Sequence, residues 1–332
     1  MSELGIHKSS GKSKGFIKWL KSGKGQRVTV IITFTLIPLF LLFIFTYLPF
    51  VKMAEFSFFD MKYIGERQFI GFDNYIDVFK RDDCFKALKL SFYYMGGAII
   101  QLALALYFAT ILSFKVKGGN LFKGMMFFPY LICGIAVGFI FKFFYTRGFV
   151  LDSLLGGIGF NLDKLPYWLK DKRINNFSLA ATSVWRYMGQ NMVLFSGAIM
   201  SVDKEMYEAA ALDGANYWQK FKYIILPSIK TIVVLNLILS ITGSLSAFEP
   251  PYVITGGNFG TGTYFVIMDR IAHQNMKVGL ASAMAIILLI IILFATLLQK
   301  LFFKYVFNDG TEDNSRRIAK KMVKKVAKGA NK

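Results

Sequence analysis

Long runs of apolar residues dominate the chain, and polar residues gather in the segments between them. A helix needs about 20 apolar residues to cross the roughly 30 Å hydrocarbon core of a bilayer. Polar residues interrupt the fourth run, which is the weakest of the set by hydropathy. The pattern predicts an all-α integral membrane protein with six transmembrane helices, at residues 28–50, 90–112, 124–144, 178–200, 227–248 and 279–302.

Composition and charge support this interpretation. Hydrophobic residues make up 55% of the 332 residues, Phe alone occurs 35 times, and only 18% of residues are charged. A net charge of +20 would also suit a nucleic-acid-binding protein. However, the basic excess is concentrated in the segments that six spans place on the side of the N-terminus. This positive-inside pattern predicts cytoplasmic N- and C-termini, a lipid bilayer as partner and no nucleic acid.

The predicted organisation is one membrane domain at residues 28–305, between a basic tail at 1–27 and a second basic tail at 306–332. Apolar residues recur among the basic residues of both tails. The tails are therefore either amphipathic helices on an anionic leaflet or solvated segments. Residues 51–89, 145–177 and 249–277 become external segments, and the first of them is expected to contain short interfacial helices.

Cysteine and histidine are too few for a disulfide framework or a metal centre. Cys84 and Cys133 are predicted at different depths, and His7 and His273 on opposite sides of the membrane. The chain has no Gly-x-x-x-x-Gly-Lys-Ser/Thr element and no catalytic set in its spans. We therefore expect no bound metal or cofactor and no enzyme activity, so any ATP hydrolysis must occur on another chain.

The segment at 201–227, between the fourth and fifth spans, has the pattern of two short helices. Asp203 and Glu205 favour a helix start, where the helix dipole is positive. Alanines at 209–211 favour helix with little bulk, and Gly214 is suited to end it in a left-handed conformation. Such a small rigid helix could dock in a groove of a cytosolic partner. An ordinary helical hairpin is the alternative.

The fourth span contains a polar and aromatic cluster formed by Trp185, Arg186, Tyr187, Gln190 and Asn191. Charged groups at membrane depth usually face a bundle interior or an aqueous cavity. The cluster could line a translocation path across the membrane, with the rings offering stacking surfaces and the amides offering hydrogen bonds. Alternatively, Arg186 pairs locally and the rings belong to the interfacial aromatic belt.

Two further polar residues, Gln101 and Asn236, lie in apolar surroundings in the second and fifth spans. Hydrogen bonds between helices are the expected role of both.

The 201–227 segment resembles the EAA loop of binding-protein-dependent ABC import permeases. The resemblance implies that this loop forms a coupling helix that docks in a cleft of the ATPase subunit. The matching residues, which become candidate ATPase-coupling residues, are Glu208, Ala209, Ala210, Asp213, Gly214, Ala215, Phe221, Leu226 and Pro227.

The resemblance continues along the chain at residues 69–75, 129–138, 248–257 and 279–283. It is strongest to the maltose-type, carbohydrate-uptake permeases. It implies a gate-proximal loop containing Glu249, Thr255, Gly256 and Gly257. Asn258 departs from the pattern, since the related loops usually have proline there.

The family resemblance implies a type I ABC importer transmembrane domain in a bacterial cytoplasmic membrane, translocating a carbohydrate, in particular an oligosaccharide. The partners implied are a second, similar permease, an ATPase dimer that holds ATP and Mg, and an extracytoplasmic solute-binding protein. The alternatives are a permease for an amino acid, peptide or polyol phosphate, and a non-transporting membrane sensor that recruits a cytosolic protein.

Overall fold

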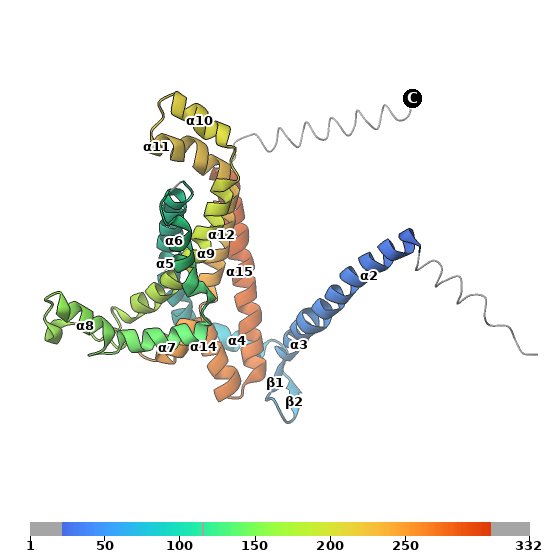
Figure 1. Ribbon diagram of the computed structural model, residues 1–332. Coiled ribbons are helices and arrows are strands. Elements are labelled where there is room, and N and C mark those ends of the chain that lie inside the picture. The colour runs from blue at the N-terminus through green and yellow to red at the C-terminus, as the bar shows by residue number, and fades with distance from the viewer. Residues whose placement is uncertain (1–21, 115, 307–332) are drawn as a thin grey trace, which may run out of the picture.

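The computed structural model describes residues 22–114 and 116–306, so most of both predicted tails lies outside the described residues. Helices account for most of this part of the chain (Figure 1). The elements, in order, are α2 (Gly23–Leu42), η1 (Phe43–Tyr47), α3 (Leu48–Phe56), β1 (Phe59–Met61), β2 (Arg67–Phe69), α4 (Asp73–Lys80), α5 (Asp82–Leu112), α6 (Gly119–Leu131), α7 (Gly134–Tyr145), α8 (Val150–Gly157), η2 (Leu162–Lys164), α9 (Asn175–Met200), α10 (Lys204–Leu212), α11 (Tyr217–Lys220), η3 (Phe221–Ile225), α12 (Leu226–Leu245), α13 (Glu249–Thr255), α14 (Tyr264–Asp269), η4 (Arg270–Gln274) and α15 (Val278–Val306).

Four predicted spans correspond to continuous apolar helices. Within the described residues, four helices are long and apolar enough to cross a membrane, namely Gly25–Phe56, Asp82–Leu112, Tyr217–Thr255 and Val278–Tyr305. They match the first, second, fifth and sixth predicted spans. The fourth prediction, 178–200, coincides with the long helix α9, which is too polar to be counted among them. The chain is therefore a multi-pass membrane protein.

The third predicted span, at 124–144, is not one continuous helix. The segment forms two helices, α6 and α7, which meet at an angle of 98°. Ile132 and Cys133 between them are extended, with ψ angles of 133° and 138°. Pro129 lacks the N–H that would bond back along α6, which weakens the last turn before the break.

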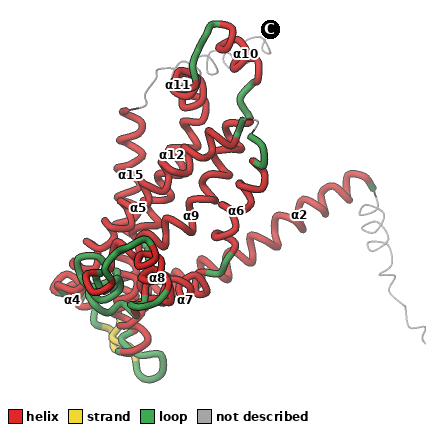
Figure 2. Tube along the Cα trace, turned by 60° about the vertical axis from the view of Figure 1, so that its left-hand side comes forward, coloured by secondary structure: helices red, strands yellow, loops and turns green. Residues whose placement is uncertain are grey.

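The long helices form a bundle with a distinct layer at each end. Helices α5, α9 and α12 pack against one another, while α10 and α11 lie at one end and α4, α7, α8 and α14 at the other (Figures 1 and 2). Helix α2 extends away from the bundle in both views, and its apolar side chains are largely exposed. Helix α3, which follows it, packs against α15.

Two apolar clusters hold α5 and α9 together at different heights. Toward α10, a cluster of Leu102, Ala105, Met192, Phe195 and Ile229, with four further buried residues, joins α5, α9 and α12. Nearer the opposite end, Tyr94 and Leu179 pack with α13. The polar stretch of α9 lies between these clusters.

Glycine allows α6 to approach α9 closely. A Cβ built at Gly189 would overlap the carbonyl oxygen of Met126, so the two backbones are in direct contact. Small residues at helix contacts are typical of membrane bundles, where association relies on close van der Waals packing.

The segment at 51–89, where the sequence predicts short helices, also contains a two-stranded hairpin. Strand β1 pairs antiparallel with β2, with Asp60 opposite Gln68. The side chain of Asn74 donates to the carbonyl oxygens of Ser57 and Phe59 at 2.9 and 3.0 Å, which fixes α4 against the hairpin. Gly279 lies against the Phe59 carbonyl and thereby joins the hairpin to the start of α15.

We predict that Gly189→Ala destabilises the protein, because the added methyl must push α6 away from α9. Overpacking of this kind costs about 1–3 kcal/mol. The matched control is Gly197→Ala in the same helix, where a Cβ meets nothing within 4 Å. Thermal unfolding in detergent should show a lower Tm for Gly189→Ala and an unchanged or raised Tm for Gly197→Ala. Equal melting temperatures would contradict the close packing of α6 on α9.

Candidate functional site

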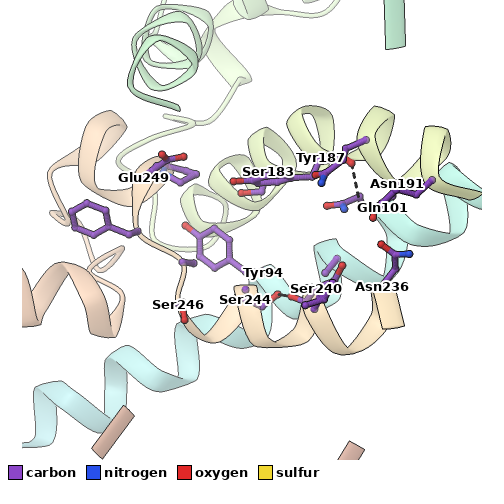
Figure 3. A pocket seen from close by; sticks show the side chains of 18 residues that line it. Tyr94, Gln101, Ser183, Tyr187, Asn191, Asn236, Ser240, Ser244, Ser246 and Glu249 are labelled. Carbon is purple, nitrogen blue, oxygen red and sulfur yellow. Dashed lines mark hydrogen bonds between the residues drawn. The ribbon is translucent and has the colours of Figure 1, made fainter. Parts of the chain in front are cut away.

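A cavity of about 490 Å³ lies between α5, α9 and α12 and ends at the corner between α12 and α13 (Figure 3). Hydroxyl and amide groups predominate among its polar side chains. Its lining residues are Tyr94, Ala98, Gln101, Ser183, Tyr187, Gln190, Asn191, Leu194, Asn236, Leu239, Ser240, Gly243, Ser244, Ser246, Ala247, Phe248, Glu249 and Pro250.

Each of the three helices contributes a stripe of residues at helical spacing. On α12 the stripe is Asn236, Ser240 and Ser244, and on α9 it includes Ser183, Tyr187 and Asn191. Residues four apart lie on the same face of a helix. These stripes therefore turn a polar face of each apolar helix toward one shared space.

The sequence interpretation found only part of this site. Tyr187, Gln190 and Asn191 line the cavity, as Figure 3 shows for Tyr187 and Asn191. Trp185 does not, because its ring packs edge-on against Phe141 with centroids 5.1 Å apart. Arg186 is also not among the lining residues, although it contacts two of them, Glu249 and Tyr187.

The expectation for Asn236 needs correction, since its side-chain amide donates at 2.8 Å to the carbonyl of Ile232 in its own helix. Both Asn236 and Gln101 line the cavity. The serines of α12 and Tyr94 were missed altogether. The repeat of polar residues every four positions along an apolar segment is the signal that would have identified the α12 stripe.

Tyr94 has an unusual hydroxyl. The residue is 4% exposed, and its oxygen makes no hydrogen bond within the described part of the chain. Figure 3 shows the ring directed into the cavity. A buried polar atom without a partner is costly, and such groups in native structures call for an explanation. A ligand hydroxyl in the cavity would satisfy it.

At the α13 end of the cavity, Arg186 of α9 and Glu249 of α13 form a hydrogen-bonded ion pair. The Arg186 side chain is 14% exposed and that of Glu249 is 42% exposed. The guanidinium also lies 5.1 Å from the ring centroid of Tyr187. The same Glu249 carboxylate lies where a Cβ of Gly134 would be, at the start of α7. Three helices thus meet at one charged contact.

The expected loop at 249–277 is partly helical. Glu249 and Thr255 lie within α13, and Gly256 ends that helix in the left-handed region with a φ of 63°. Gly257 continues with a φ of 70°. Asn258, which replaces the usual proline, donates its side-chain amide to the Thr255 carbonyl at 3.0 Å. A side-chain hydrogen bond therefore closes this turn.

The segment between α9 and α12 folds into the two expected helices. Gly214 has a φ of 76°, as the sequence predicts. Its N–H bonds to the Ala211 carbonyl at 3.1 Å, and the N–H of Ala215 bonds to the Ala210 carbonyl at 2.9 Å. These two bonds form a Schellman motif, which satisfies the last carbonyls of α10.

A capping box that the sequence interpretation missed begins α11, in which Asn216 and Gln219 exchange hydrogen bonds. Phe221 does not point outward but packs with Tyr207 against the apolar cluster of α5, α9 and α12. Pro227 lies in the first turn of α12, as expected.

The outer surface of this segment has no partner in the structure and is exposed. Glu208, Ala209, Asp213 and Gly214 are all exposed, as are Leu226 and Pro227, while Ala210 and Ala215 are half-buried. Leu212 and Tyr217 beside them are 90% and 84% exposed. Phe221 packs on the bundle on one side of this segment, and the other side is exposed. Helices α10 and α11 therefore project from the end of the bundle (Figure 1).

The chain belongs to the family described as the binding-protein-dependent transport system inner membrane component, whose model matches residues 101–307. It is thus a transporter permease, a class that works with a solute-binding protein. The matched region includes the whole cavity apart from Tyr94 and Ala98, together with the α10–α11 projection.

Curated relatives extend over most of the chain. An arabinooligosaccharides transport system permease protein of Bacillus subtilis (strain 168) is 33% identical and covers 68% of this chain and 73% of its own length. An osmoprotective compounds uptake permease protein of Synechocystis sp. (strain ATCC 27184 / PCC 6803 / Kazusa) is 31% identical, with 75% and 90% covered.

Among solved structures, a bacterial alginate ABC transporter in complex with an alginate-pentasaccharide-bound periplasmic protein contains a chain of similar fold. The TM-score is 0.74 at 20% sequence identity, with 85% of this chain and 96% of that chain covered. The fold is therefore that of type I ABC permeases.

We predict that Gly214→Val abolishes uptake while the protein still inserts and assembles, because a β-branched residue resists the left-handed conformation at the end of α10. Gly214→Asn is the matched control, since Asn tolerates this conformation best among side-chain-bearing residues. No neighbour lies within 4 Å of a Cβ at this position, so both variants differ from the parent in backbone preference and not in packing. Solute uptake in cells, normalised to membrane-inserted protein, measures the effect, and normal uptake by Gly214→Val would contradict the prediction.

Proposed function

We propose that this chain is the permease subunit of an ATP-driven importer that translocates a carbohydrate, in particular an oligosaccharide, delivered by an external solute-binding protein. The observation that carries this proposal is the polar cavity enclosed by α5, α9 and α12 of a binding-protein-dependent permease. In this proposal α6 with α7 and the polar helix α9 complete six spans, and both termini are cytoplasmic. The low hydropathy of α9 then follows from its role as a cavity wall.

The lining of the cavity suits a polyhydroxylated substrate. Serine hydroxyls, three carboxamides from Gln101, Asn191 and Asn236, and the ring of Tyr187 offer hydrogen bonds and a stacking surface. Sites of this kind are typically about 300–1,000 Å³ in volume, with a few placed polar groups that orient the ligand. Relatives whose names specify arabinooligosaccharides, starch degradation products and multiple sugars support the same substrate class.

The α10–α11 projection is the proposed contact with the ATPase. Its exposed face carries Glu208, Ala209, Asp213 and Gly214, with Ala210 and Ala215 behind them and Phe221, Leu226 and Pro227 joining it to α12. A cleft on the ATPase could bind the alanine-rich face of α10, because small side chains let the two backbones approach closely in helix-in-groove docking. ATP and Mg would be held by the partner, and this chain would bind no cofactor.

A second permease is the remaining proposed partner. Helix α2 exposes Phe34, Leu39 and Phe40, each more than half exposed, along a helix that leaves the bundle. Lipid can contact one part of this exposed apolar surface and a second permease can contact another part. The proposed location is the bacterial cytoplasmic membrane.

The direct test is co-purification of the tagged chain from its native membrane, followed by reconstitution with the captured proteins and the binding protein. ATP-dependent uptake of a labelled oligosaccharide is the expected result. Uptake of an osmoprotective compound in place of saccharides would favour the second candidate, which the Synechocystis relative supports. Recovery of the chain without an ATPase or second permease, even after crosslinking, would contradict the proposal and favour a membrane sensor.

We predict that Tyr94→Phe weakens substrate transport without weakening the fold. Removing a buried hydroxyl that has no protein partner removes its desolvation cost, so the Tm should be unchanged or higher. A lost hydrogen bond to the substrate costs about 0.5–1.5 kcal/mol, which raises the substrate concentration for half-maximal uptake roughly two- to tenfold. Tyr75→Phe serves as the control, because that hydroxyl bonds Ser57 at 2.7 Å, away from the cavity. Unchanged uptake kinetics in Tyr94→Phe would contradict a role for this hydroxyl in binding.

A further inference from the structure

We propose that the Arg186–Glu249 ion pair is a latch that holds the α13 end of the cavity shut and must break before the substrate can enter. The inference rests on the proposed function, because it assigns a role to two residues within that transport cycle. Arg186 and Glu249 act here as positioning residues, since they set the position of α13.

The latch joins three helices that enter this region from different parts of the chain. Arg186 projects from the middle of α9, Glu249 is the first residue of α13, and Gly134 is the first residue of α7. The Glu249 carboxylate bonds the guanidinium and lies directly against Gly134, with no space for a side chain there. One turn further along α7, Gly138 lies against Val253 of α13 in the same way. Two glycine contacts and one ion pair therefore clamp α13 onto α7 and α9.

Moving α13 would open the cavity, because the corner before it forms the wall. Ser246, Phe248 and Pro250 line the cavity at this end, on either side of Glu249. Toward the opposite end of the bundle, α5, α9 and α12 meet in the apolar cluster that contains the large buried side chains Met192 and Phe195. At the α13 end, the ion pair is the charged contact beside the glycine contacts of α7 and the small apolar cluster that hold α13 in place.

A charge pair suits a latch that must open and close. The Arg186 side chain is 14% exposed while that of Glu249 is 42% exposed, so the guanidinium is largely shielded from water and the carboxylate stays within reach of it. Partial shielding strengthens the attraction between the two charges. When α13 moves away, water can solvate both charges, so the open state is accessible in spite of the strong closed contact. For comparison, the arginine of the Arg173–Asp171 pair is 88% exposed.

The latch also touches the substrate site. The Arg186 guanidinium lies over the ring of Tyr187, and Tyr187 lines the cavity. A saccharide that stacks on Tyr187 would shift the ring on which the guanidinium rests. Occupancy of the cavity and the strength of the ion pair are thereby linked through one side chain.

The test uses the full complex of this chain with its second permease and ATPase in nanodiscs, with ATP hydrolysis as the readout. In the proposed cycle, ATP-driven closure of the ATPase opens the α13 end, so a broken latch favours the hydrolytic state. Glu249→Gln removes the charge with little change of shape. Gly134→Ala instead places a methyl where the carboxylate lies and keeps the charge. Both variants are expected to raise basal hydrolysis, measured without binding protein or saccharide, by about tenfold, the shift that corresponds to losing one charged hydrogen bond.

Two matched variants serve as controls. Asp171→Asn breaks an exposed ion pair, and Gly124→Ala adds a methyl in α6 where nothing lies within 4 Å. Both should hydrolyse ATP at the wild-type basal rate. Arg186→Gln combined with Glu249→Gln should raise the rate no further than either change alone, because both remove the same contact.

The outcomes separate the latch from the function on which it rests. If the wild-type complex is not stimulated by saccharide-loaded binding protein, the proposed function fails and the latch with it. If the wild type responds while assembled Glu249→Gln and Gly134→Ala complexes keep the basal rate of the controls, the latch is wrong. A purely structural ion pair would lower assembly and hydrolysis together, so a gain in basal hydrolysis is the result that only a latch predicts.

Discussion

Helices in a bilayer do not gain hydrophobic free energy by packing against one another, because lipid tails are as apolar as their side chains. Close contact and polar bonds must hold the bundle together, and in this protein glycine provides the contact. Gly189 brings α6 against α9, while Gly134 and Gly138 bring α7 against α13. These approaches fix α6 and α7 around α9 despite the 98° bend between them. The α13 corner that bounds the cavity depends on the same contacts.

The polar side chains of the long helices are concentrated on the faces that line the cavity. The stripes on α5, α9 and α12 face one shared cavity of about 490 Å³. Membrane-embedded polar groups are costly unless they bond one another or face such a cavity. The cavity, the charged contact at its α13 end and the α10–α11 projection therefore lie along one bundle. The projection packs against the apolar cluster of α5, α9 and α12. Tyr207 of α10 and Phe221 pack against this cluster, so the projection is in contact with the core of α5, α9 and α12.

Hydrophobic runs predicted the long helices α5, α12 and α15 well, and propensity with a single glycine predicted the left-handed end of α10 at Gly214. These features are local, so the sequence contains the information that determines them. The bend after Pro129 was missed because the contacts around it are distant in sequence. Gly134 packs against Glu249 and Gly138 against Val253, each more than a hundred residues away. Arg186 was recognised as exceptional, but its partner lies on another helix and no periodicity reveals it. The cavity was found only where polar residues cluster, on α9, and was missed where small serines are spread along α12.

The most direct test of the account is whether saccharide occupies the cavity between α5, α9 and α12. Ser240→Cys, in a background with Cys84 and Cys133 replaced by Ala, places one thiol in the cavity, and Ser282→Cys places one in a separate pocket near α14 and α15. Maleimide labelling of the reconstituted complex is followed with ATP and binding protein, with and without saccharide. The account predicts that saccharide slows labelling of Ser240→Cys and leaves Ser282→Cys unchanged. Equal labelling of Ser240→Cys under both conditions, in a complex that transports the saccharide, would contradict it.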